Sequence, residues 1–493
     1  MTSDSLMLTP STLLHASDTL TVIDDKSVIS IYDIRSNRRR LFVLIMIAFS
    51  SIILPFCDTV YLPALAQLEH DLKTSTTLVD YTISSYLVTC GSFGLLWGPL
   101  SDRFGRKIIL LISFAFFTAF TIVCTLARSI IVLLIFRSLQ GGAISASLIV
   151  GQSVVVDMYP PERLGFAMGL FLVPLLVGPI IGPFIGGALA SSFGWRSTFV
   201  ALIIMAAIST IVILVFVPET HHYFITQRQL KLGKKIKTNT IREIHSISKP
   251  TFMPPWRPFV FLLDITIAPH IFVCATIFGT LFVSLTLIAN RAADKPYSLS
   301  PFLIGLCYIP TGTCSLLGSL CGGYVSDWSA KRFSRIAEGR LVISLLGATL
   351  CPMGLLLCGW TFHFNVHIVV PLIGASMFCF GETFIFTSVA AFVNVKRSAM
   401  AGAILALINA LSFVCAGLGI IGAIPLVAVI KFGPLFSLLA GLSSFTIIIA
   451  MVVVANQFRK TAFIIRASDL PKAESFSIKN KQIIEESTSL QWF

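Results

Sequence analysis

Long uncharged runs of apolar residues recur from Leu41 to Ala455, and they constrain the fold of this chain more than any other feature. Each run can cross about 30 Å of hydrocarbon as a helix. Charged residues make up 12% of the chain, whereas a soluble domain carries about 25%. We therefore predict an all-α membrane protein with twelve transmembrane helices, at residues 41–66, 78–100, 107–127, 131–156, 164–190, 196–217, 265–289, 301–325, 341–361, 366–393, 400–424 and 432–455.

A polar stretch separates the first six predicted helices from the last six. The sequence thus predicts five segments: a disordered cytoplasmic N-terminal tail (1–40), an N-terminal six-helix half (41–217), a basic cytoplasmic central loop (218–264), a C-terminal six-helix half (265–455) and a cytoplasmic C-terminal tail (456–493). The basic part of the central loop, from Gln227 to Lys249, is expected to lie against anionic lipid head groups, with a binding module as the alternative.

Lysine and arginine residues gather in the loops at one side of the predicted bundle. They lie before the first span and after each even-numbered span, at residues 35–40, 103–107, 228–257, 331–340, 396–397 and 459–460. Because such residues are retained in the cytoplasm, both termini are expected there. The expected location is the plasma membrane, with the vacuolar membrane as the alternative. A basic charge confined to loops does not predict nucleic-acid binding.

The 11 cysteines contain no C-x-x-C pair and lie mostly inside apolar runs, so they are expected to be small buried side chains and not metal ligands. His221 and His222 adjoin each other beside the membrane surface, which is a weak pattern for a metal site. No phosphate-binding loop of the G-x-x-x-x-G-K-[ST] kind occurs, which argues against ATP-driven export. No metal and no cofactor are expected.

One turn occurs twice in the chain. After the second span the sequence reads Gly-Pro-Leu-Ser-Asp-Arg-Phe-Gly-Arg-Lys over 98–107, and after the eighth it reads Gly-Tyr-Val-Ser-Asp-Trp-Ser-Ala-Lys-Arg over 323–332. The repeat at equivalent places predicts two pseudo-symmetric halves. In the first copy, Gly98 is expected to allow close helix approach, and Asp102 to cap the next helix. Arg106 and Lys107 are expected to anchor the turn at the membrane surface, and anchoring alone is the alternative role.

This turn resembles the signature loop of the major facilitator superfamily, and the resemblance covers all twelve spans. It implies the major facilitator fold and a charge network that locks the outward-facing state, in which the loop's acid and base join an acid at the end of span four. Asp157 and Arg163 stand where those partners belong. The residues implied in this conformational switch are Gly98, Asp102, Arg103, Gly105, Arg106, Asp157, Arg163 and Asp327.

Span four carries Arg137-Ser-Leu-Gln140-Gly-Gly inside an apolar run. Transferring an arginine side chain to the middle of a membrane costs roughly 3 kcal/mol or more in free energy, so Arg137 has to face a water-filled cavity or a partner. The string resembles the family's R-x-x-Q-G motif, which is linked to proton transfer. The alternative is a structural role in which Arg137 hydrogen-bonds backbone carbonyls.

Span five places small residues at regular intervals. Gly178, Gly182 and Gly186 recur every four residues, so they share one face and permit close packing. The full set resembles the family's antiporter motif, which favours export over import, and comprises Gly178, Pro179, Gly182, Pro183, Gly186 and Gly187. A purely structural groove is the alternative. The glycines of span eight, namely Gly305, Gly312, Gly318 and Gly322, are expected to form the facing surface.

More narrowly, the chain resembles the twelve-spanning drug:proton antiporters of fungi, especially the quinidine-resistance type. The resemblance rests on Tyr61-Leu-Pro-Ala-Leu, on the 305–327 stretch and on Val217-Pro-Glu-Thr. Asn394 and Asn409 stand where such proteins often have an acid and an arginine.

Few carboxyl groups are expected at membrane depth. Asp58 in span one and Glu382 in span ten are the candidates for proton coupling or cation recognition, while Asp264 lies at the mouth of span seven. A place near the outer interface for Asp58, and a salt-bridged or cavity-lining place for Glu382, are the alternatives.

The predicted function is alternating-access export of lipophilic or cationic compounds, driven by protons. Its expected partners are the small-molecule substrate, protons and the lipid bilayer, with no nucleic acid, and the protein is expected to be a monomer. One alternative is a proton-coupled or facilitative carrier of a nutrient such as a polyamine, amino acid or sugar. A membrane-embedded enzyme or receptor is disfavoured, because no nucleophile–base pair or metal cluster is visible in the sequence.

Overall fold

The computed structural model describes residues 36–159, 161–231, 254–332, 339–342, 344–397 and 400–468. Within these ranges the secondary structure is helical and contains no strand, which confirms the all-α class. Most of the predicted N-terminal tail, residues 232–253 of the central loop and the last part of the C-terminal tail lie outside the described residues.

The N-terminal half begins with a broken span and continues with five long helices. The broken span comprises α2 (Asn37–Ser51), α3 (Ile53–Thr59), η3 (Leu62–Ala64) and α4 (Leu65–Leu72). The long helices are α5 (Thr76–Phe104), α6 (Arg106–Leu126), α7 (Ile130–Met158), α8 (Pro161–Phe193) and α9 (Arg196–Phe216), and α10 (His222–Lys231) follows them.

The C-terminal half repeats this pattern of long helices. Its elements are η4 (Arg257–Leu263), α12 (Ala268–Ala293), α13 (Pro301–Arg332), α14 (Gly339–Val342), α15 (Leu345–His363), α16 (Val369–Lys396), α17 (Ala401–Ile430) and α18 (Phe432–Ser468). Together with the N-terminal half this gives the twelve predicted spans among the described residues.

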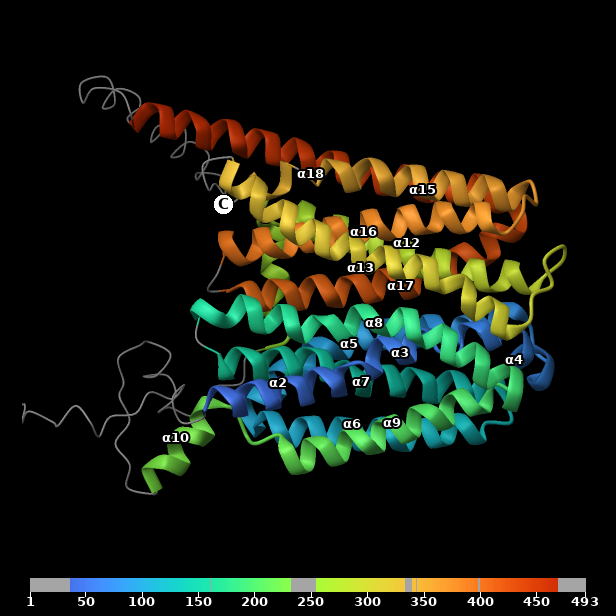
Figure 1. Ribbon diagram of the computed structural model, residues 1–493, viewed down its shortest axis with the longest axis horizontal. Coiled ribbons are helices and arrows are strands. Elements are labelled where there is room, and N and C mark those ends of the chain that lie inside the picture. Colours follow the sequence, from blue (N-terminus) through green and yellow to red (C-terminus); the bar gives the residue numbers. More distant parts are fainter. Residues whose placement is uncertain are drawn as a thin grey trace, which may run out of the picture.

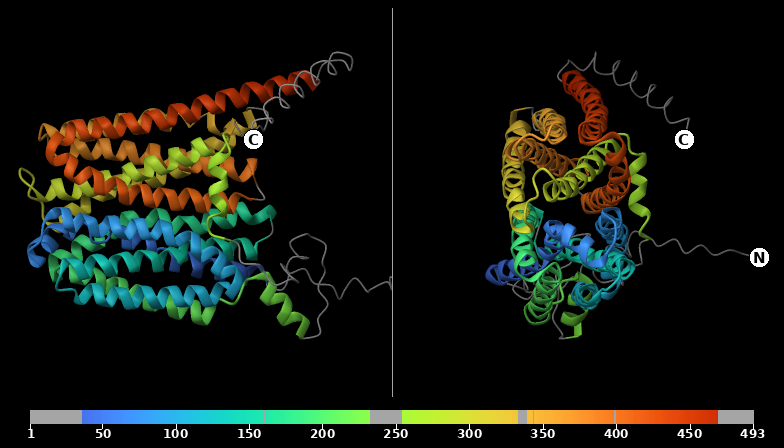
Figure 2. Two further views of the ribbon diagram at one scale, coloured as in Figure 1. Left: turned by 180° about the vertical axis from the view of Figure 1, so that it is seen from behind. Right: turned by 90° about the vertical axis from the view of Figure 1, so that its right-hand side faces the viewer.

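The long helices lie side by side in one bundle (Figure 1). Seen along the helices, the blue-to-green N-terminal half and the yellow-to-red C-terminal half occupy opposite sides of the bundle (Figure 2, right). We call the end at which α2 begins and α18 finishes the tail end, and the end that carries α4 the far end. The two ends are the reference for every position given below.

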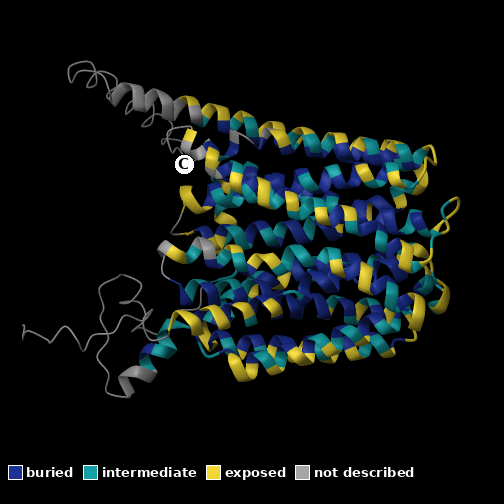
Figure 3. Cartoon of the chain, viewed as in Figure 1, coloured by how far each residue is buried: buried dark blue, intermediate teal, exposed yellow. Residues whose placement is uncertain are grey.

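Eleven helices in the described part of the chain are long and apolar enough to cross a membrane. The twelfth span is α5, which has the length and place of a span but is more polar. Exposed residues follow the outer faces of the helices (Figure 3), and many of them are large and apolar, such as Phe445 and Ile448 on α18. Such surfaces suit lipid, because helices satisfy their own backbone groups in hydrocarbon.

The sequence predicts the first span as one continuous helix, but the structure divides it. It breaks after Ser51, and again between Thr59 and Leu62. Proline has no backbone N–H, and Pro63 occupies the first turn of η3, where that missing donor is tolerated. The first span is thus divided into four short helices, α2, α3, η3 and α4.

Two seams hold the halves together, one between α5 and α17 and the other between α8 and α13. On the second seam, a Cβ atom on Gly305 would lie 2.4 Å from the Pro183 carbonyl oxygen, and one on Gly187 would lie 2.4 Å from the Pro301 carbonyl oxygen. These approaches lie toward the far end, where α8 finishes and α13 begins. The halves therefore touch backbone to backbone there.

Candidate functional site

Arg137 lies at the centre of a polar cluster inside the N-terminal half. Arg137 lies on α7 and its side chain is fully buried. Its Nη1 atom donates to Gln140 Oε1 at 2.6 Å and to Cys57 Sγ at 3.2 Å. Gln140 in turn donates from Nε2 to Thr121 Oγ1 at 2.7 Å. The hydrogen-bond partners of Arg137 are thus side chains of its own half, not the backbone carbonyls of the alternative role.

Two tyrosine rings flank the Arg137 guanidinium. Its Cζ atom lies 4.2 Å from the ring centre of Tyr61 and 4.4 Å from that of Tyr86. Such cation–π contacts gain strength where water is excluded. The Arg137 Nε and Nη2 atoms have no hydrogen-bond partner, so the rings supply much of the stabilisation of this charge.

Asp58 belongs to the same cluster. It lies on α3 beside Cys57, is 3% exposed, and its Oδ1 atom has no hydrogen-bond partner. Tyr86 lies beside its carboxyl group, with the hydroxyl donating to the Leu54 carbonyl oxygen at 3.5 Å, and Arg137 is the nearby charge. Asp58 is therefore buried within the N-terminal half. We call Asp58, Tyr61, Tyr86, Arg137 and Gln140 the N-half cluster.

Glu382 lies in the interior of the other half. It is 3% exposed on α16, and no hydrogen bond or ion pair joins it to any described residue. Its charge acts on the thiols of Cys274 on α12, Cys351 on α15 and Cys379 on α16, which surround it. Glu382 thus forms no salt bridge with a described residue, and it lies outside the N-half cluster.

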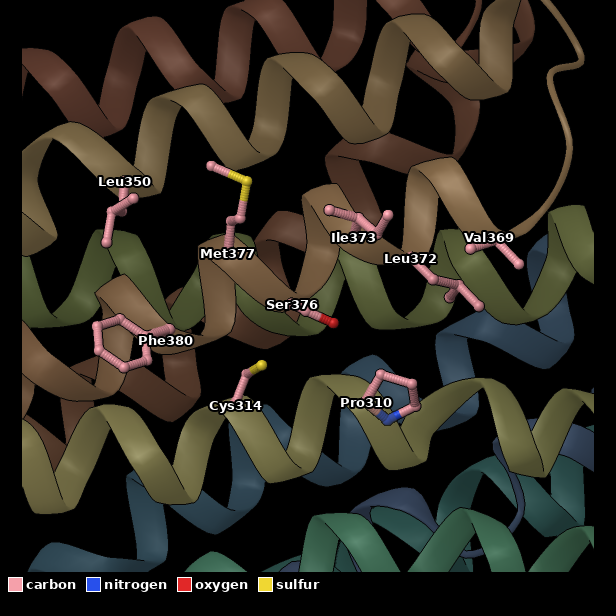
Figure 4. Close-up of a pocket in the computed structure, with 9 residues that line it drawn as sticks. All are labelled: Pro310, Cys314, Leu350, Val369, Leu372, Ile373, Ser376, Met377 and Phe380. Atoms are coloured by element: carbon pink, nitrogen blue, oxygen red, sulfur yellow. The ribbon is translucent and has the colours of Figure 1, made fainter.

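The cavities of the described residues do not coincide with either carboxyl group. A space of about 10 Å³ lies between the halves, where Gly91 and Ser145 face Asn409 and Phe413. A larger one of about 480 Å³ lies within the C-terminal half, between α13, α15 and α16 (Figure 4). Its walls are apolar except for Ser376. In this arrangement no large space separates the two halves near Asn409.

A charge network lies at the tail end of the N-terminal half. Arg106 bonds Asp102 Oδ1 through Nη1 at 2.6 Å and Asp157 Oδ2 through Nε at 2.9 Å. Nη1 also donates to Ser101 Oγ at 2.6 Å. The structure therefore brings together the loop's acid, its base and the acid at the end of α7. We call this group the tail-end network.

Other residues of the predicted switch lie apart from this network. Arg163 is exposed, and no hydrogen bond or ion pair joins it to a described residue. Arg103 is exposed and lies over the ring of Phe104, with 5.7 Å from its Cζ atom to the ring centre. The side chain of Asp327 lies outside the described residues. An added Cβ on Gly98 would make only ordinary contact with Ile149 at 3.8 Å, so the expected close approach is absent there.

The cap of α6 differs from the expectation that Asp102 would provide it. Glu219, after α9, accepts from the backbone N–H of Arg106 at 3.0 Å through Oε1 and from that of Lys107 at 3.2 Å through Oε2. Asp102 is instead occupied by the Arg106 side chain. Gly105 precedes α6 with a φ of +99°, a conformation that glycine adopts without strain.

The glycine face of α8 packs mainly against the first span of its own half. Cβ atoms on Gly178, Gly182 and Gly186 would lie 2.7 Å from Pro55 Cγ, 2.5 Å from Thr59 Oγ1 and 1.6 Å from the Val60 carbonyl oxygen. The expected partner surface on α13 is correct only in part. Gly305 and Gly312 face α8, whereas Gly318 and Gly322 face α16.

Two titratable groups near the tail end have shifted pKa values. Burial, followed by the charge of Arg106, lowers the pKa of His221 below the usual histidine value. Burial alone raises the pKa of Asp264, but hydrogen bonds from Thr266 and from the Arg397 guanidinium bring it below its usual value. Asp264 is thus held in an ion pair with Arg397 at 2.9 Å, at the mouth of span seven.

Sequence reasoning missed one buried carboxyl group. Asp80 on α5 is 0% exposed, and the Asn290 side chain on α12 donates to its Oδ2 atom at 2.8 Å. The signal was present, because Asp80 is a charge within a predicted span. Its partner could not be found from the sequence, since the two residues lie 210 positions apart.

No group of three histidine, cysteine, aspartate or glutamate side chains is placed to hold a metal ion in the part of the chain that the structure describes.

Comparison with protein families gives a match that covers most of the chain. The model described as Major Facilitator Superfamily matches residues 47–420.

Similar curated proteins come from fungi. A protein named MFS-type transporter penM, from Penicillium rubens, is 30% identical over 78% of this chain and 80% of its own length. The MFS antiporter QDR3 of Candida albicans is 25% identical, covering 82% of this chain and 76% of its own. The multidrug transporter DTR1 of Candida glabrata is 28% identical, covering 69% of this chain and 70% of its own.

Solved structures share the fold. The xylose transporter XylE from E. coli, in a partially occluded inward open conformation, superposes with a TM-score of 0.63 at 14% identity, covering 84% of this chain and 97% of that one. At this identity the likeness concerns architecture, and it agrees with the two-half arrangement of twelve helices described above.

Proposed function

Because the chain belongs to the major facilitator superfamily, whose members are membrane transporters and not enzymes, we propose that it is a proton-coupled antiporter that exports lipophilic or cationic small molecules. Two relatives favour this over uptake, since one is named an antiporter and another a multidrug transporter. The xylose transporter supports the architecture alone.

The observation that carries the proposal is the N-half cluster. A carboxyl group and a guanidinium lie in one sealed interior without an ion pair between them. The Asp58 Oδ1 atom and two Arg137 nitrogen atoms have no hydrogen-bond partner. Buried polar groups are normally satisfied, and an ionisable side chain inside a membrane span is by default a candidate for a functional site.

In this proposal Asp58 binds the proton. Arg137 is held in place by Gln140 and by the two tyrosine rings, so its charge is present whether or not the proton is bound. When the proton has left, this fixed charge compensates the carboxylate. A cationic substrate and a proton then compete for the same carboxyl group, which couples the exit of one to the entry of the other.

Glu382 provides a second carboxyl group in the C-terminal half. Its surroundings are thiols and apolar side chains, which suit the apolar part of a lipophilic cation more than a sugar with many hydroxyl groups. We assign to Glu382 a second proton or a second contact with the cationic group, in addition to the site at Asp58.

The proposal extends to the setting of the protein. Described basic residues of the loops, such as Arg40, Arg106 and Arg397, lie at the tail end, so we place that end and both termini in the cytoplasm and take the plasma membrane as the site of action. The protein acts as a monomer in this proposal. The switch residues at the tail end and the glycines of α8 serve the movement between the two access states.

Purified protein in liposomes with an imposed pH gradient tests this proposal. The panel contains rhodamine 6G, quinidine, spermidine, arginine and xylose, with flux measured with and without the gradient. We expect gradient-dependent flux of the lipophilic cations. Uptake of xylose or an amino acid that persists without the gradient would support the nutrient carrier and contradict the antiporter.

Matched variants connect the flux to the two carboxyl groups. Asp58→Asn and Glu382→Gln keep shape and remove the proton site, so each is expected to lower gradient-driven flux at least tenfold while the amount of folded protein is unchanged. Asp294→Asn alters an exposed acid on the α12–α13 turn and serves as the control. Normal transport by both carboxyl variants at every pH tested would refute the assignment.

A further inference from the structure

The Asp80–Asn290 pair joins the two halves of the bundle. Asp80 lies near the start of α5 in the N-terminal half, and Asn290 near the end of α12 in the C-terminal half. Both helix ends lie at the far end of the bundle. The Nδ2 atom of Asn290 donates to Asp80 Oδ2 at 2.8 Å. A side-chain bond thus crosses the interface at the far end, where the α8–α13 seam is also close.

The Asp80–Asn290 hydrogen bond can form only while the two halves are in contact at the far end. Asp80 is 0% exposed and its Oδ1 atom has no hydrogen-bond partner. One turn along α5, the Ser84 carbonyl oxygen would lie 2.5 Å from a Cβ on Gly417 of α17. The charged neighbour of Asp80 is Glu69 on α4, which accepts from Thr76 at 2.9 Å. Separation of the halves would break the pair and open Asp80 to water.

The tail end has a different arrangement. The tail-end network of Arg106, Asp102 and Asp157 is built on α5, α6 and α7, all in the N-terminal half. The Asp264–Arg397 ion pair joins two parts of the C-terminal half. Each of these links stays intact when the halves move as rigid bodies. The Asp80–Asn290 bond breaks in that movement, because its two residues belong to different halves.

We propose that Asp80 and Asn290 are positioning residues of the transport cycle and form a latch that holds the far end closed. The proposal rests on alternating access, but not on the identity of the substrate or of the coupling ion. An amide donor suits a contact that breaks in every cycle, because a carboxylate with a buried cationic partner is much harder to separate. Loss of one such hydrogen bond shifts an equilibrium between two states by about tenfold.

The test measures opening at each end separately. The far-end reporter is Ser84→Cys, at a buried position on the α5–α17 seam, and the tail-end reporter is Ala406→Cys, which lines the small space between the halves. Protein in lipid nanodiscs is treated with a membrane-impermeant maleimide, and the labelling rate at each reporter is read by peptide mass spectrometry, so the native cysteines remain in place.

We expect Asn290→Ala and Asp80→Ala to raise the far-end labelling rate about tenfold, by the same hydrogen-bond estimate, and to lower the tail-end rate. The exchanged pair Asp80→Asn with Asn290→Asp restores a bond between amide and carboxyl group, and should restore both rates. Asn394→Ala, at an exposed asparagine of α16, is the control and should change neither.

A structural role for the pair gives a different result. Rates that rise together at both ends, or a lowered unfolding temperature with unchanged rates, would overturn the latch. Failure of the exchanged pair to restore the rates would also count against it. None of these readouts depends on transport, so a wrong substrate class leaves the result intact, and a failed latch leaves the proton coupling at Asp58 and Glu382 untouched.

Discussion

Arg137 shows how a single charge can be kept inside a membrane protein. No ion pair joins it to a described carboxylate, although Asp58 lies in the same cluster. Hydrogen bonds to Gln140 and Cys57 and the faces of Tyr61 and Tyr86 stabilise the guanidinium instead. A planar, delocalised cation fits between two rings, and a compact ammonium does not. The site therefore depends on the shape of arginine as well as on its charge.

This dependence predicts the effect of Arg137→Lys. The lysine keeps the charge but loses the stacked geometry and the fixed contact with Gln140, so we expect gradient-driven flux in liposomes to fall at least tenfold while folded protein is retained. Arg128→Lys, at an exposed arginine between α6 and α7, is the control and should transport normally. Full transport by Arg137→Lys would mean that charge alone is sufficient.

The sequence identified part of the N-half cluster and missed the rest for a physical reason. Arg137, Gln140 and Asp58 are recognisable because each is polar within an apolar run. Their neighbours Cys57 and Thr121 carry no such signal, since small polar side chains are common in spans. Which small polar side chain contacts Arg137 depends on how α3, α6 and α7 pack against one another. The sequence of one helix does not contain that information.

At the scale of the helix, α8 is defined by the face that carries its glycines. The Cβ positions of Gly178, Gly182 and Gly186 are filled by residues 55–60 of the first span, so α8 and that span approach more closely than side chains would allow. The spacing of four residues predicted a packing face correctly. It could not say that the partner is the first span of the same half.

Glycine-to-alanine substitutions along α8 should therefore change the stability in opposite directions, depending on the position. Gly186→Ala places a methyl group 1.6 Å from the Val60 carbonyl oxygen, and such overpacking costs about 1–3 kcal/mol. We expect a lower unfolding temperature in detergent and less folded protein. Gly169→Ala, on the same helix with nothing within 4 Å, should be neutral or stabilising, because alanine favours a helix by about 1 kcal/mol over glycine.

An equal loss of stability in the two variants would place the cause in the helix itself and not in its contact with the first span.

Helix ends were harder to predict than helix centres. Hydropathy located the spans because each has to cross the same thickness of lipid. The break after Ser51 and the cap on α6 depend on other forces. Glu219 reaches the start of α6 from a loop 113 residues away in the sequence, whereas the nearby Asp102 bonds Arg106 instead.

Over the whole molecule, close contacts between the halves extend from the far end to the middle of the bundle, where a Cβ atom on Gly91 of α5 would lie 2.4 Å from the Ala410 carbonyl oxygen of α17. On one seam Asp80 bonds Asn290. On the other, Gly305 and Gly312 of α13 meet Pro183 and Ile180 of α8. Toward the tail end of α13, Gly323 has nothing within 4 Å of its Cβ position. The repeated Ser-Asp turns predicted two halves, but only the packed structure shows which residues of the two halves meet.

The seam at Gly305 should control the arrangement of the halves more than their stability. A Cβ atom there would lie 2.4 Å from the Pro183 carbonyl oxygen, and the contact joins two bodies that can move apart, unlike the Gly186 contact inside one half. Gly305→Ala is thus expected to open the far end. Spin labels at His70 and Asp294, on exposed far-end positions of the two halves, should report longer distances by double electron–electron resonance, with the unfolding temperature nearly unchanged. Gly323→Ala, on the same helix, should leave the distances as they are. A large loss of stability in Gly305→Ala without a change in distance would show that the halves do not separate along this seam.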